Sequence, residues 1–435
     1  MKKLFLLMIP VLAALMSCSD GSPEDPNRAD KDPEMVIDML PKTRSIVLTQ
    51  EQRTFVGKST DFSFNLFRAI SQMPEGKKSS IVSPISVTYV LGMLNDGASG
   101  NTAKEISSVV GFGEGKTQAV NDFCKKLIDE APKTDPSVTL EIANIVIGND
   151  YRHVGFEPPY VHDMQDYYRA EITNLDFSQK TETLAEVNGW CNDKTHGMIP
   201  EILKESELKA NALLLLMNAI YFKATWTEKF DPADTRDKTF TTADGKTLSL
   251  PMMHRKALAQ YSENDVCTML NLPYGSGDKW SMKVLLPREG KTVDDVIATL
   301  NAESWQQLRY NGWSPIVDIE MPRFKTSFET DLKQPLSGMG APTMFTPGAA
   351  EFPNICSNYK QDLYVFLMKQ KAAIEVDEEG TKASAVTITG LLDSAAPWSY
   401  EKPMNVDFHA NRPFVYVIQE ASSGVIFFLG TYRGE

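Results

Sequence analysis

The chain has 435 residues, of which 42% are hydrophobic and 23% are charged. This composition is that of a globular protein, and it excludes collagen-like, coiled-coil and wholly disordered classes for most of the chain. The length permits a large buried core. The net charge of −13 disfavours a nucleic-acid partner, because an acidic surface repels a phosphate backbone.

The first residues have the features of a secretory signal peptide. Lys2 and Lys3 form a basic start, and the apolar run Leu4–Leu15 is shorter than the about 20 residues that span a bilayer. The run ends in Leu-Met-Ser-Cys, which resembles the lipidation motif of bacterial lipoproteins, although Met replaces the usual small residue. We predict a signal peptide over residues 1–17 and lipidation of Cys18, which would anchor an exported protein at the outer membrane or cell surface. An ordinary cleaved signal followed by an incidental cysteine is the alternative.

The next segment lacks the features of a folded element. Residues 19–48 contain four prolines and many charges, with little periodicity of apolar side chains. Such a segment cannot bury enough surface to offset the entropy of ordering it. We predict a lipidated disordered tether over residues 18–48 and, because no linker interrupts the chain afterwards, a single domain over residues 55–435.

The other four cysteines are Cys124, Cys191, Cys267 and Cys356, and their spacing matches neither a Cys-x-x-Cys pair nor a zinc pattern. Cys191 and Cys267 lie in segments that have the character of buried elements, which favours free buried thiols. Two disulfides are the alternative in an exported chain.

Helices are predicted mainly in roughly the first 200 residues and strands in the remainder, an α+β arrangement around large sheets. A helix is expected to begin at Ser83, where a capping hydroxyl precedes a proline. Capping boxes that start at Thr102 and Thr183 predict two more helices. The apolar run at 212–222 predicts a strand covered on both faces, and residues 413–429 predict a buried hairpin.

No local motif of an enzyme, a metal site or a cofactor site is present in the sequence. The five histidines, which are His153, His162, His196, His254 and His409, form no short metal pattern, and there is no Gly-x-Ser-x-Gly turn. We therefore predict that the chain is not an enzyme and needs no metal or cofactor. A Ser/His/Asp triad can be scattered along a chain and then has no local signature, so the lack of a motif does not show that such a triad is absent.

One connection near the C-terminus is unusually long. Residues 373–376 predict a strand, and the stretch between Gly380 and Pro413 far exceeds an ordinary connection. Strand pairing is not blocked there, because no proline occurs from Ala372 to Ala396. Alternate residues would form one face of small side chains that could enter between two existing strands: Thr381, Ala383, Ala385, Thr387, Thr389 and Leu391. A surface hairpin or a disordered loop is the alternative interpretation.

An ordered set of motifs resembles the serpin family over residues 55–435. The motifs are NLF at 65–67, SPISVTYVLGMLNDGASGNTAKEI at 83–106, VNGWCNDKTHGMIPEIL at 187–203, NAIYFKATWTEKFD at 218–231, MPRFK at 321–325, IEVDEEGTKASA at 374–385 and ANRPFVYVI at 410–418. One such motif would be weak evidence, but their number and order make the resemblance specific. With the N-terminal features, the chain resembles a bacterial, lipoprotein-anchored serine protease inhibitor.

The resemblance implies a fold and a mechanism. The fold is the α+β serpin fold, with three β-sheets, about nine helices and an exposed reactive-centre loop after a hinge. A target protease cleaves this loop and forms an acyl-enzyme, and the cleaved loop inserts into the main sheet and displaces the protease before it is released. The chain would then be a suicide substrate, with strain stored in an incomplete sheet and no catalytic residue of its own.

The resemblance also assigns the hinge and the scissile bond. The hinge is Glu378, Glu379, Gly380, Thr381, Lys382, Ala383, Ser384 and Ala385, and insertion begins at Gly380 and Thr381. Counting about seventeen residues from Glu378 places the scissile bond at Ser394–Ala395. Small residues around this bond suit elastase-like proteases, whereas Leu392, the alternative, suits chymotrypsin-like or cathepsin-like enzymes. Trypsin-like proteases are expected to cleave without being trapped, because Lys402 is the only basic residue of the loop after the hinge.

A further group of residues matches the family's sheet-opening region. Ser83, Ser86 and Asn218 match a polar cluster beneath the opening, and Gln370 stands where a histidine usually faces them. Glutamine can donate and accept, so we expect the cluster to survive with less pH dependence. Trp226 matches the position where the sheet first opens. Arg323 is expected to pair with Glu378.

The expected partners are serine proteases, with cysteine proteases as a second class, bound covalently by a monomer. The protein is expected to contact a membrane only through its lipid anchor, and it is not expected to bind nucleic acid. A non-inhibitory serpin acting as a surface binding module is the alternative function. Non-inhibitory serpins usually carry bulky or charged residues in the hinge, and in the segment TKASA at 381–385 only Lys382 is of this kind. A surface hydrolase or glycan-binding lipoprotein has no supporting motif.

Overall fold

The computed structural model describes residues 42–359, 362–381 and 404–434. These residues form nine α-helices and three β-sheets, so the predicted α+β fold with three sheets and about nine helices is confirmed. The helices are α1 (Gln50–Ser71), α2 (Pro84–Gly97), α3 (Gly100–Val110), α4 (Thr117–Glu130), α5 (Pro158–Tyr167), α6 (Lys180–Lys194), α7 (Val293–Thr299), α8 (Ala302–Tyr310) and α9 (Lys333–Gly338).

Two of the sheets have six strands and one has four. The main sheet has the order β11 (Phe324–Asp331), β12 (Lys369–Val376), β13 (Gly380–Thr381), β4 (Leu214–Thr225), β2 (Val138–Asn149) and β3 (Glu171–Leu175). The second sheet has the order β1 (Ser80–Val82), β16 (Ile426–Tyr432), β15 (Phe414–Glu420), β9 (Trp280–Pro287), β8 (Cys267–Tyr274) and β7 (Tyr261–Glu263). The four-stranded sheet has the order β14 (Asn405–His409), β10 (Ile316–Pro322), β6 (Thr247–Leu258) and β5 (Arg236–Thr241). The predicted strand at 212–222 is β4, and the predicted hairpin is β15 with β16.

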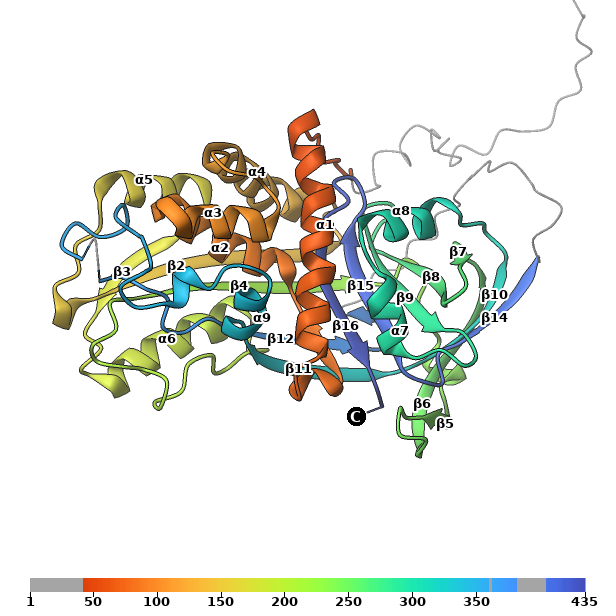
Figure 1. Cartoon of the computed structure of the whole chain (residues 1–435). Coiled ribbons are helices and arrows are strands. Elements are labelled where there is room, and N and C mark those ends of the chain that lie inside the picture. Colours follow the sequence, from red (N-terminus) through yellow and green to blue (C-terminus); the bar gives the residue numbers. More distant parts are fainter. Residues whose placement is uncertain (1–41, 360–361, 382–403, 435) are drawn as a thin grey trace, which may run out of the picture. The chain divides into compact units, whose positions relative to one another are not determined.

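Helices cover both faces of the main sheet. Leu214 and Leu216 of β4 pack against the large core that contains α2, whereas Leu215 packs with Val187 and Cys191 of α6. Because successive residues of a strand point to opposite faces, α2 and α6 lie on opposite sides of β4 (Figure 1). The helix α2 begins at its predicted cap, where the Ser83 hydroxyl accepts a hydrogen bond from the amide of Ser86.

Two predicted helix starts are wrong by about one turn. The helix α3 begins at Gly100 and α6 at Lys180, so Thr102 and Thr183 lie inside the helices. Their hydroxyls make other contacts: Thr102 accepts a hydrogen bond from the amide of Glu351 at 3.0 Å, and Thr183 donates one to the carbonyl of Asp176 at 2.9 Å. Such partners lie outside the local pattern that suggested a cap.

The folded unit also begins earlier than residue 55. Ile46 and Leu48 are 3% and 6% exposed, and α1 begins at Gln50. The amide of Arg44 donates to the carbonyl of Thr134 at 2.8 Å, and the amide of Ile46 donates to the Ser422 hydroxyl at 2.9 Å. Residues 42–48 therefore belong to the domain and not to a disordered tether. Residues 1–41, with the predicted signal peptide and Cys18, lie outside the described residues.

Cys124, Cys191, Cys267 and Cys356 are buried and free, as predicted. They lie on α4, on α6, on β8 and in the connection between η7 (Thr343–Phe345) and β12. Within the described part of the chain, no helix has the length and apolar character required to cross a bilayer.

The main sheet is incomplete between β12 and β4. The short strand β13 joins them at one end, where Thr381 pairs with Val376 of β12 and with Ala224 of β4. Both neighbours run antiparallel to β13 and therefore parallel to each other. No other backbone pairing among the described residues connects the two strands. Beyond Thr381, residues 369–375 of β12 and 214–223 of β4 thus flank a gap in the ladder, which we call the sheet gap.

Candidate functional site

A tight turn leads from β12 into the sheet gap. The carboxylate of Asp377 accepts hydrogen bonds from the amides of Glu379 and Gly380, at 2.9 and 3.2 Å. The Trp226 indole donates to the carbonyl of Asp377 at 2.9 Å, and the Trp226 amide donates to the carbonyl of Glu379 at 2.8 Å. Trp226 is 2% exposed and stacks on Tyr274, with ring centroids 4.5 Å apart. The turn is therefore held against a buried aromatic pair where the gap begins.

Glu378 is a buried charged group of this turn, with its side chain 5% exposed. It accepts hydrogen bonds from Nη2 and Nε of Arg323, at 2.5 and 3.1 Å, and from the Thr235 hydroxyl at 2.6 Å. Burial alone would raise the pKa of Glu378, but the hydrogen bonds from Arg323 and Thr235 outweigh it and hold the pKa below its usual value. The structure thus contains the ion pair expected between Arg323 and Glu378. The neighbouring Glu379 pairs with Lys229 at 2.5 Å.

Gly380 and Thr381 already lie in the sheet as strand residues. Gly380 has a φ of +147°, and a Cβ there would lie 2.3 Å from the carbonyl oxygen of Ala224 and 2.6 Å from the Cα of Thr225. Only glycine fits without displacement of the backbone. Thr381 is 2% exposed, and its hydroxyl shares a hydrogen bond of 2.6 Å with that of Tyr274. Gly380 therefore pairs with β4, and Thr381 pairs with both flanking strands.

The expected polar cluster lies in the sheet gap beside Asn218 of β4 and Gln370 near the start of β12, and it has two parts. Gln370 donates to the carbonyl of Ser83 at 2.8 Å and accepts from its amide at 2.9 Å. The Ser86 hydroxyl donates to the side-chain oxygen of Asn218, whose amide nitrogen donates to Asn144 at 2.8 Å. Gln370 thus binds the backbone at the start of α2. The side chains of this cluster are amides and hydroxyls, which carry no charge.

Three small cavities lie along the sheet gap. The first, of about 30 Å³, lies between Thr381 and the polar cluster, and the second, of about 60 Å³, lies beside the cluster and extends to Lys369. The third, of about 30 Å³, is lined by Leu214 and by residues 363–368, which directly precede β12. Each cavity has β4 on one side and β12 or its preceding segment on the other. The space between the two strands is therefore incompletely packed along its length.

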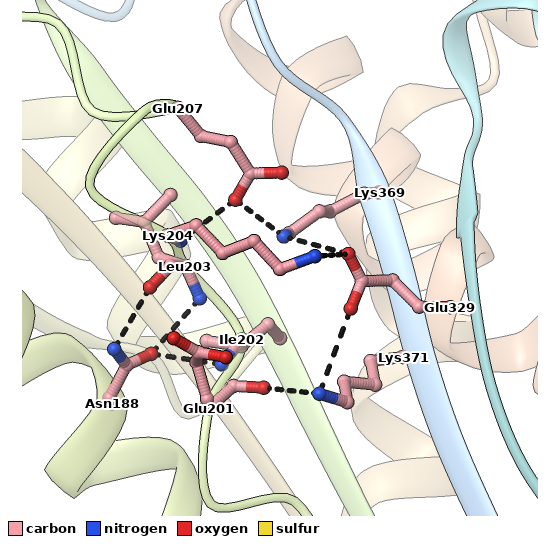
Figure 2. Close-up of polar contacts among 9 residues, drawn as sticks. All are labelled: Asn188, Glu201, Ile202, Leu203, Lys204, Glu207, Glu329, Lys369 and Lys371. Carbon is pink, nitrogen blue, oxygen red and sulfur yellow. Dashed lines mark hydrogen bonds and ion pairs between the residues drawn. The ribbon is translucent and has the colours of Figure 1, made fainter.

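A network of lysines and glutamates closes the other end of the sheet gap (Figure 2). Lys369 of β12 pairs with Glu207 at 2.7 Å and with Glu329 of β11 at 3.3 Å. Glu329 also pairs with Lys204 at 3.1 Å and with Lys371 at 3.6 Å. Because residues 204 and 207 belong to the connection between α6 and β4, these ion pairs join that connection to β11 and β12. We call this group the lysine–glutamate network.

The connection is itself fixed to α6. The side-chain oxygen of Asn188 accepts hydrogen bonds from the amides of Ile202 and Leu203, at 2.8 and 3.0 Å, and its amide donates to the carbonyl of Leu203 at 2.9 Å. Lys371 donates to the carbonyl of Glu201 at 2.9 Å (Figure 2). Opening this end of the gap therefore requires that contacts to the α6–β4 connection break.

The remaining predicted site residues lie outside the described residues. They are Cys18, the hinge residues Lys382, Ala383, Ser384 and Ala385, and the candidate cleavage positions Leu392, Ser394 and Ala395.

Several residues of the site were not found by the analysis of the sequence. The spacing of Asp377 and Gly380 is a turn signal that could have indicated the hairpin. Tyr274, Thr235 and Lys229, in contrast, meet the hinge from more than a hundred residues away in the sequence. The lysine–glutamate network likewise brings together three separate segments, so no local pattern identifies it.

The chain is similar to known proteins over most of its length. The family model described as Serpin (serine protease inhibitor) matches residues 57–433. Glia-derived nexin of Homo sapiens is 31% identical over 361 residues, which are 80% of this chain and 86% of that protein. Antithrombin-III of Mus musculus is 30% identical over 375 residues, 85% of this chain and 79% of that protein. The crystal structure of tengpin, a thermophilic serpin in the native state, has a TM-score of 0.77 at 24% identity and covers 92% of this chain and 99% of that one, a likeness of fold.

Proposed function

The chain belongs to the serpin family, and on that basis we propose that it inhibits serine proteases as a suicide substrate. The protease cleaves within residues 382–403 and is trapped as an acyl-enzyme when the freed segment enters the sheet gap. The observation that carries this proposal is β13, because Gly380 already pairs with β4 and Thr381 pairs with strands on both sides of the gap. Insertion would then extend a ladder of hydrogen bonds that has already begun. In this mechanism the protein provides the cleavable loop and the inserted strand, and it needs no catalytic group of its own.

The register of β13 determines which residues would pair after cleavage. Because Thr381 pairs with Ala224 and Val376, each later residue would pair one position further back on β4 and on β12. In this register Leu391 would reach Leu214, where β4 begins. The strand β4 therefore offers partners for residues 382–391, all of which lie before either candidate cleavage site.

The same register brings a threonine to the polar cluster. Thr387 would lie between Asn218 of β4 and Gln370 of β12, and its hydroxyl could hydrogen-bond to amide groups that line the gap. Ala383 and Ala385 would occupy the inward-facing positions between Thr381 and Thr387. Small side chains at these positions match the limited space of the cavities, so the loop sequence and the gap are complementary.

We propose elastase-like enzymes as the main target class, with cleavage at Ser394–Ala395. The residues LLDSAA at 391–396 place small side chains on both sides of this bond, which suits a shallow primary pocket. Cleavage after Leu392 by chymotrypsin-like or cathepsin-like enzymes is the second choice. We also propose export and anchoring through Cys18, on the basis of the basic and apolar start of the chain.

The test is the reaction of the full-length chain with pancreatic elastase, chymotrypsin and trypsin. We expect elastase to give a complex that resists SDS, a released C-terminal peptide that begins at Ala395, and a cleaved form that melts at a higher temperature than the native form. A peptide that begins at Asp393 would move the reactive bond to Leu392. Trypsin is expected to give no complex.

One result would contradict the inhibitor proposal. If each protease cleaves the loop but no complex forms and the melting temperature does not rise, the loop is not inserting. The protein would then be a non-inhibitory binding module.

A further inference from the structure

The four-stranded sheet carries a group of metal-ligating side chains on one face. In the register of this sheet, Glu320 of β10 lies between His254 of β6 and His409 of β14, and Asp318 lies beside Asp407 of β14. Residues two positions apart on a strand share a face, so the five side chains lie together. The intervening residues of β10 are fully buried, which places these five on the face away from the core.

The ligand atoms form two overlapping groups of three, which share Asp318. Nε2 of His254 lies 3.0 Å from Oδ1 of Asp318, and Nε2 of His409 lies 3.5 Å from the same oxygen. The ligand atoms of His254, Asp318 and Glu320 lie within 4.8 Å of one another, and so do those of Asp318, Asp407 and His409. Two ligand atoms on one tetrahedral zinc ion, with bonds of about 2.0–2.2 Å, lie about 3.4 Å apart. Both distances between the imidazoles and Asp318 are near that value.

His409 has a nitrogen that lacks a hydrogen bond. Its Nε2 is a buried atom without a hydrogen-bond partner, although the side chain as a whole is 36% exposed. A neutral imidazole with a free lone pair is the commonest protein ligand for zinc-class ions. His254 and Asp318 are 36% and 32% exposed, so an ion can reach the group from solvent.

The charges around the group favour a cation. Three carboxylates are present, and the lysines that face them are Lys238, which pairs with Glu320, and Lys256, which lies opposite Asp318 in the register. With neutral imidazoles, the carboxylates outnumber the lysines. Because Lys238 already pairs with Glu320, the carboxylates left for an ion are Asp318 and Asp407.

We propose that this face binds one divalent transition-metal ion of the zinc class through Asp318, Asp407 and His409, while His254 orients Asp318 from a second shell through their contact of 3.0 Å. Such an ion would join two strands, β10 and β14. The strand β14 is an edge strand whose one described partner is β10, and it follows residues 382–403 in the chain. The ion would therefore fasten the strand that follows the cleavable segment.

The test is Zn²⁺ binding by the full-length chain, measured by isothermal titration calorimetry, with Cys18→Ser to remove the N-terminal thiol. We expect one ion per chain, a higher melting temperature with Zn²⁺, and a change in the visible spectrum of Co²⁺ when it replaces Zn²⁺. Asp407→Asn and His409→Gln should each weaken binding about 10-fold or more. The matched control is His162→Gln, an exposed histidine on α5, which should leave affinity unchanged.

Melting curves without metal show whether each variant is folded. Failure of the parent chain to bind Zn²⁺ below about 1 mM would overturn the proposal. The proposal would also be overturned if folded Asp407→Asn and His409→Gln variants bound Zn²⁺ as tightly as the parent chain, or if His162→Gln weakened binding as much as they do.

Discussion

The two ends of the sheet gap are closed by contacts of different kinds. At the hinge end, a backbone ladder joins β12, β13 and β4, and the side chains that support it are almost fully buried, with Trp226 and Thr381 each 2% exposed. At the other end, the lysine–glutamate network joins side chains only, and its carboxylates, Glu207 and Glu329, are 24% and 28% exposed.

The difference indicates a direction for insertion. A backbone ladder can grow by one residue at a time, because each new residue pairs with both neighbours as it enters. Ion pairs that water partly screens have to break when a strand arrives, but each costs little to break. Insertion should therefore start at Thr381 and meet its last resistance at the lysine–glutamate network.

The largest effect is expected from Gly380→Val, which would block the start of the ladder. A Cβ at this position lies 2.3 Å from the carbonyl oxygen of Ala224, at a φ of +147°. We expect about 1–3 kcal/mol of strain and a loss of SDS-resistant complex, with cleavage retained. Electrophoresis after reaction with elastase measures both. Gly189→Ala, where a Cβ meets nothing within 4 Å, is the control and should behave as the parent chain.

A smaller effect is expected from Arg323→Met, which leaves Glu378 buried without its cation. We expect a loss of about 1–2 kcal/mol near pH 7, because the half-exposed Arg323 is partly screened. The pKa of Glu378 is held below its usual value of 4.5, so the pair stabilises the fold above pH 4.5 and is lost as the pH falls through the lower folded value. Denaturant unfolding should show that the deficit shrinks below that pH. An equal deficit in the exposed control Arg53→Met would contradict this role.

The proposed register of the inserted strand can be tested with Thr387→Val, which should change the stability of the cleaved form alone. If Thr387 reaches Asn218 and Gln370, loss of its hydroxyl should cost the inserted form about 1 kcal/mol and leave the uncleaved form unchanged. Calorimetry of both forms measures this difference. Ser384→Ala is the matched control, because the same register directs residue 384 to the opposite face. A larger effect of Ser384→Ala would show that the register is shifted by one residue.

The smallest effect is expected at the lysine–glutamate network. Glu329→Gln weakens three ion pairs and should lower the native stability by about 0.5 kcal/mol at low salt, with a smaller loss at high salt. It should also speed the rise in thermal stability that follows cleavage. Glu375→Gln is the control, since it removes an exposed pair with Lys325 on the same two strands. If both variants insert at the parent rate, the network does not limit insertion.

Much of this arrangement follows from local sequence. The cap at Ser83, the apolar strand β4 and the hairpin of β15 and β16 each have a pattern in consecutive residues, and the structure contains all three. The starts of α3 and α6 were misplaced because Thr102 and Thr183 bond to groups outside the helices. Ile46 and Leu48 were assigned to a tether because a run of three apolar residues, 46–48, shows no periodicity from which an element could be predicted.

The contacts across the sheets were harder to predict. The ion pair of Arg323 and Glu378 was expected only through the family resemblance. The network around Glu329 and the histidines of the four-stranded sheet come from strands that are distant in sequence, and their spacing follows no short metal or ion-pair motif. Their proximity is decided by strand register, which single-sequence patterns do not contain.

The buried free cysteines have a consequence for the redox conditions in which the protein can work. Burial raises the pKa of Cys124, Cys267 and Cys356 to about 12 and that of Cys191 to about 11, so the reactive thiolate is scarce. In the part of the chain that the structure describes, no disulfide ties one side of the sheet gap to the other. Oxidants should therefore not lock the sheet, and reductants should have no bond there to release. We expect the loop insertion proposed above to proceed in the same way in an oxidising or a reducing environment.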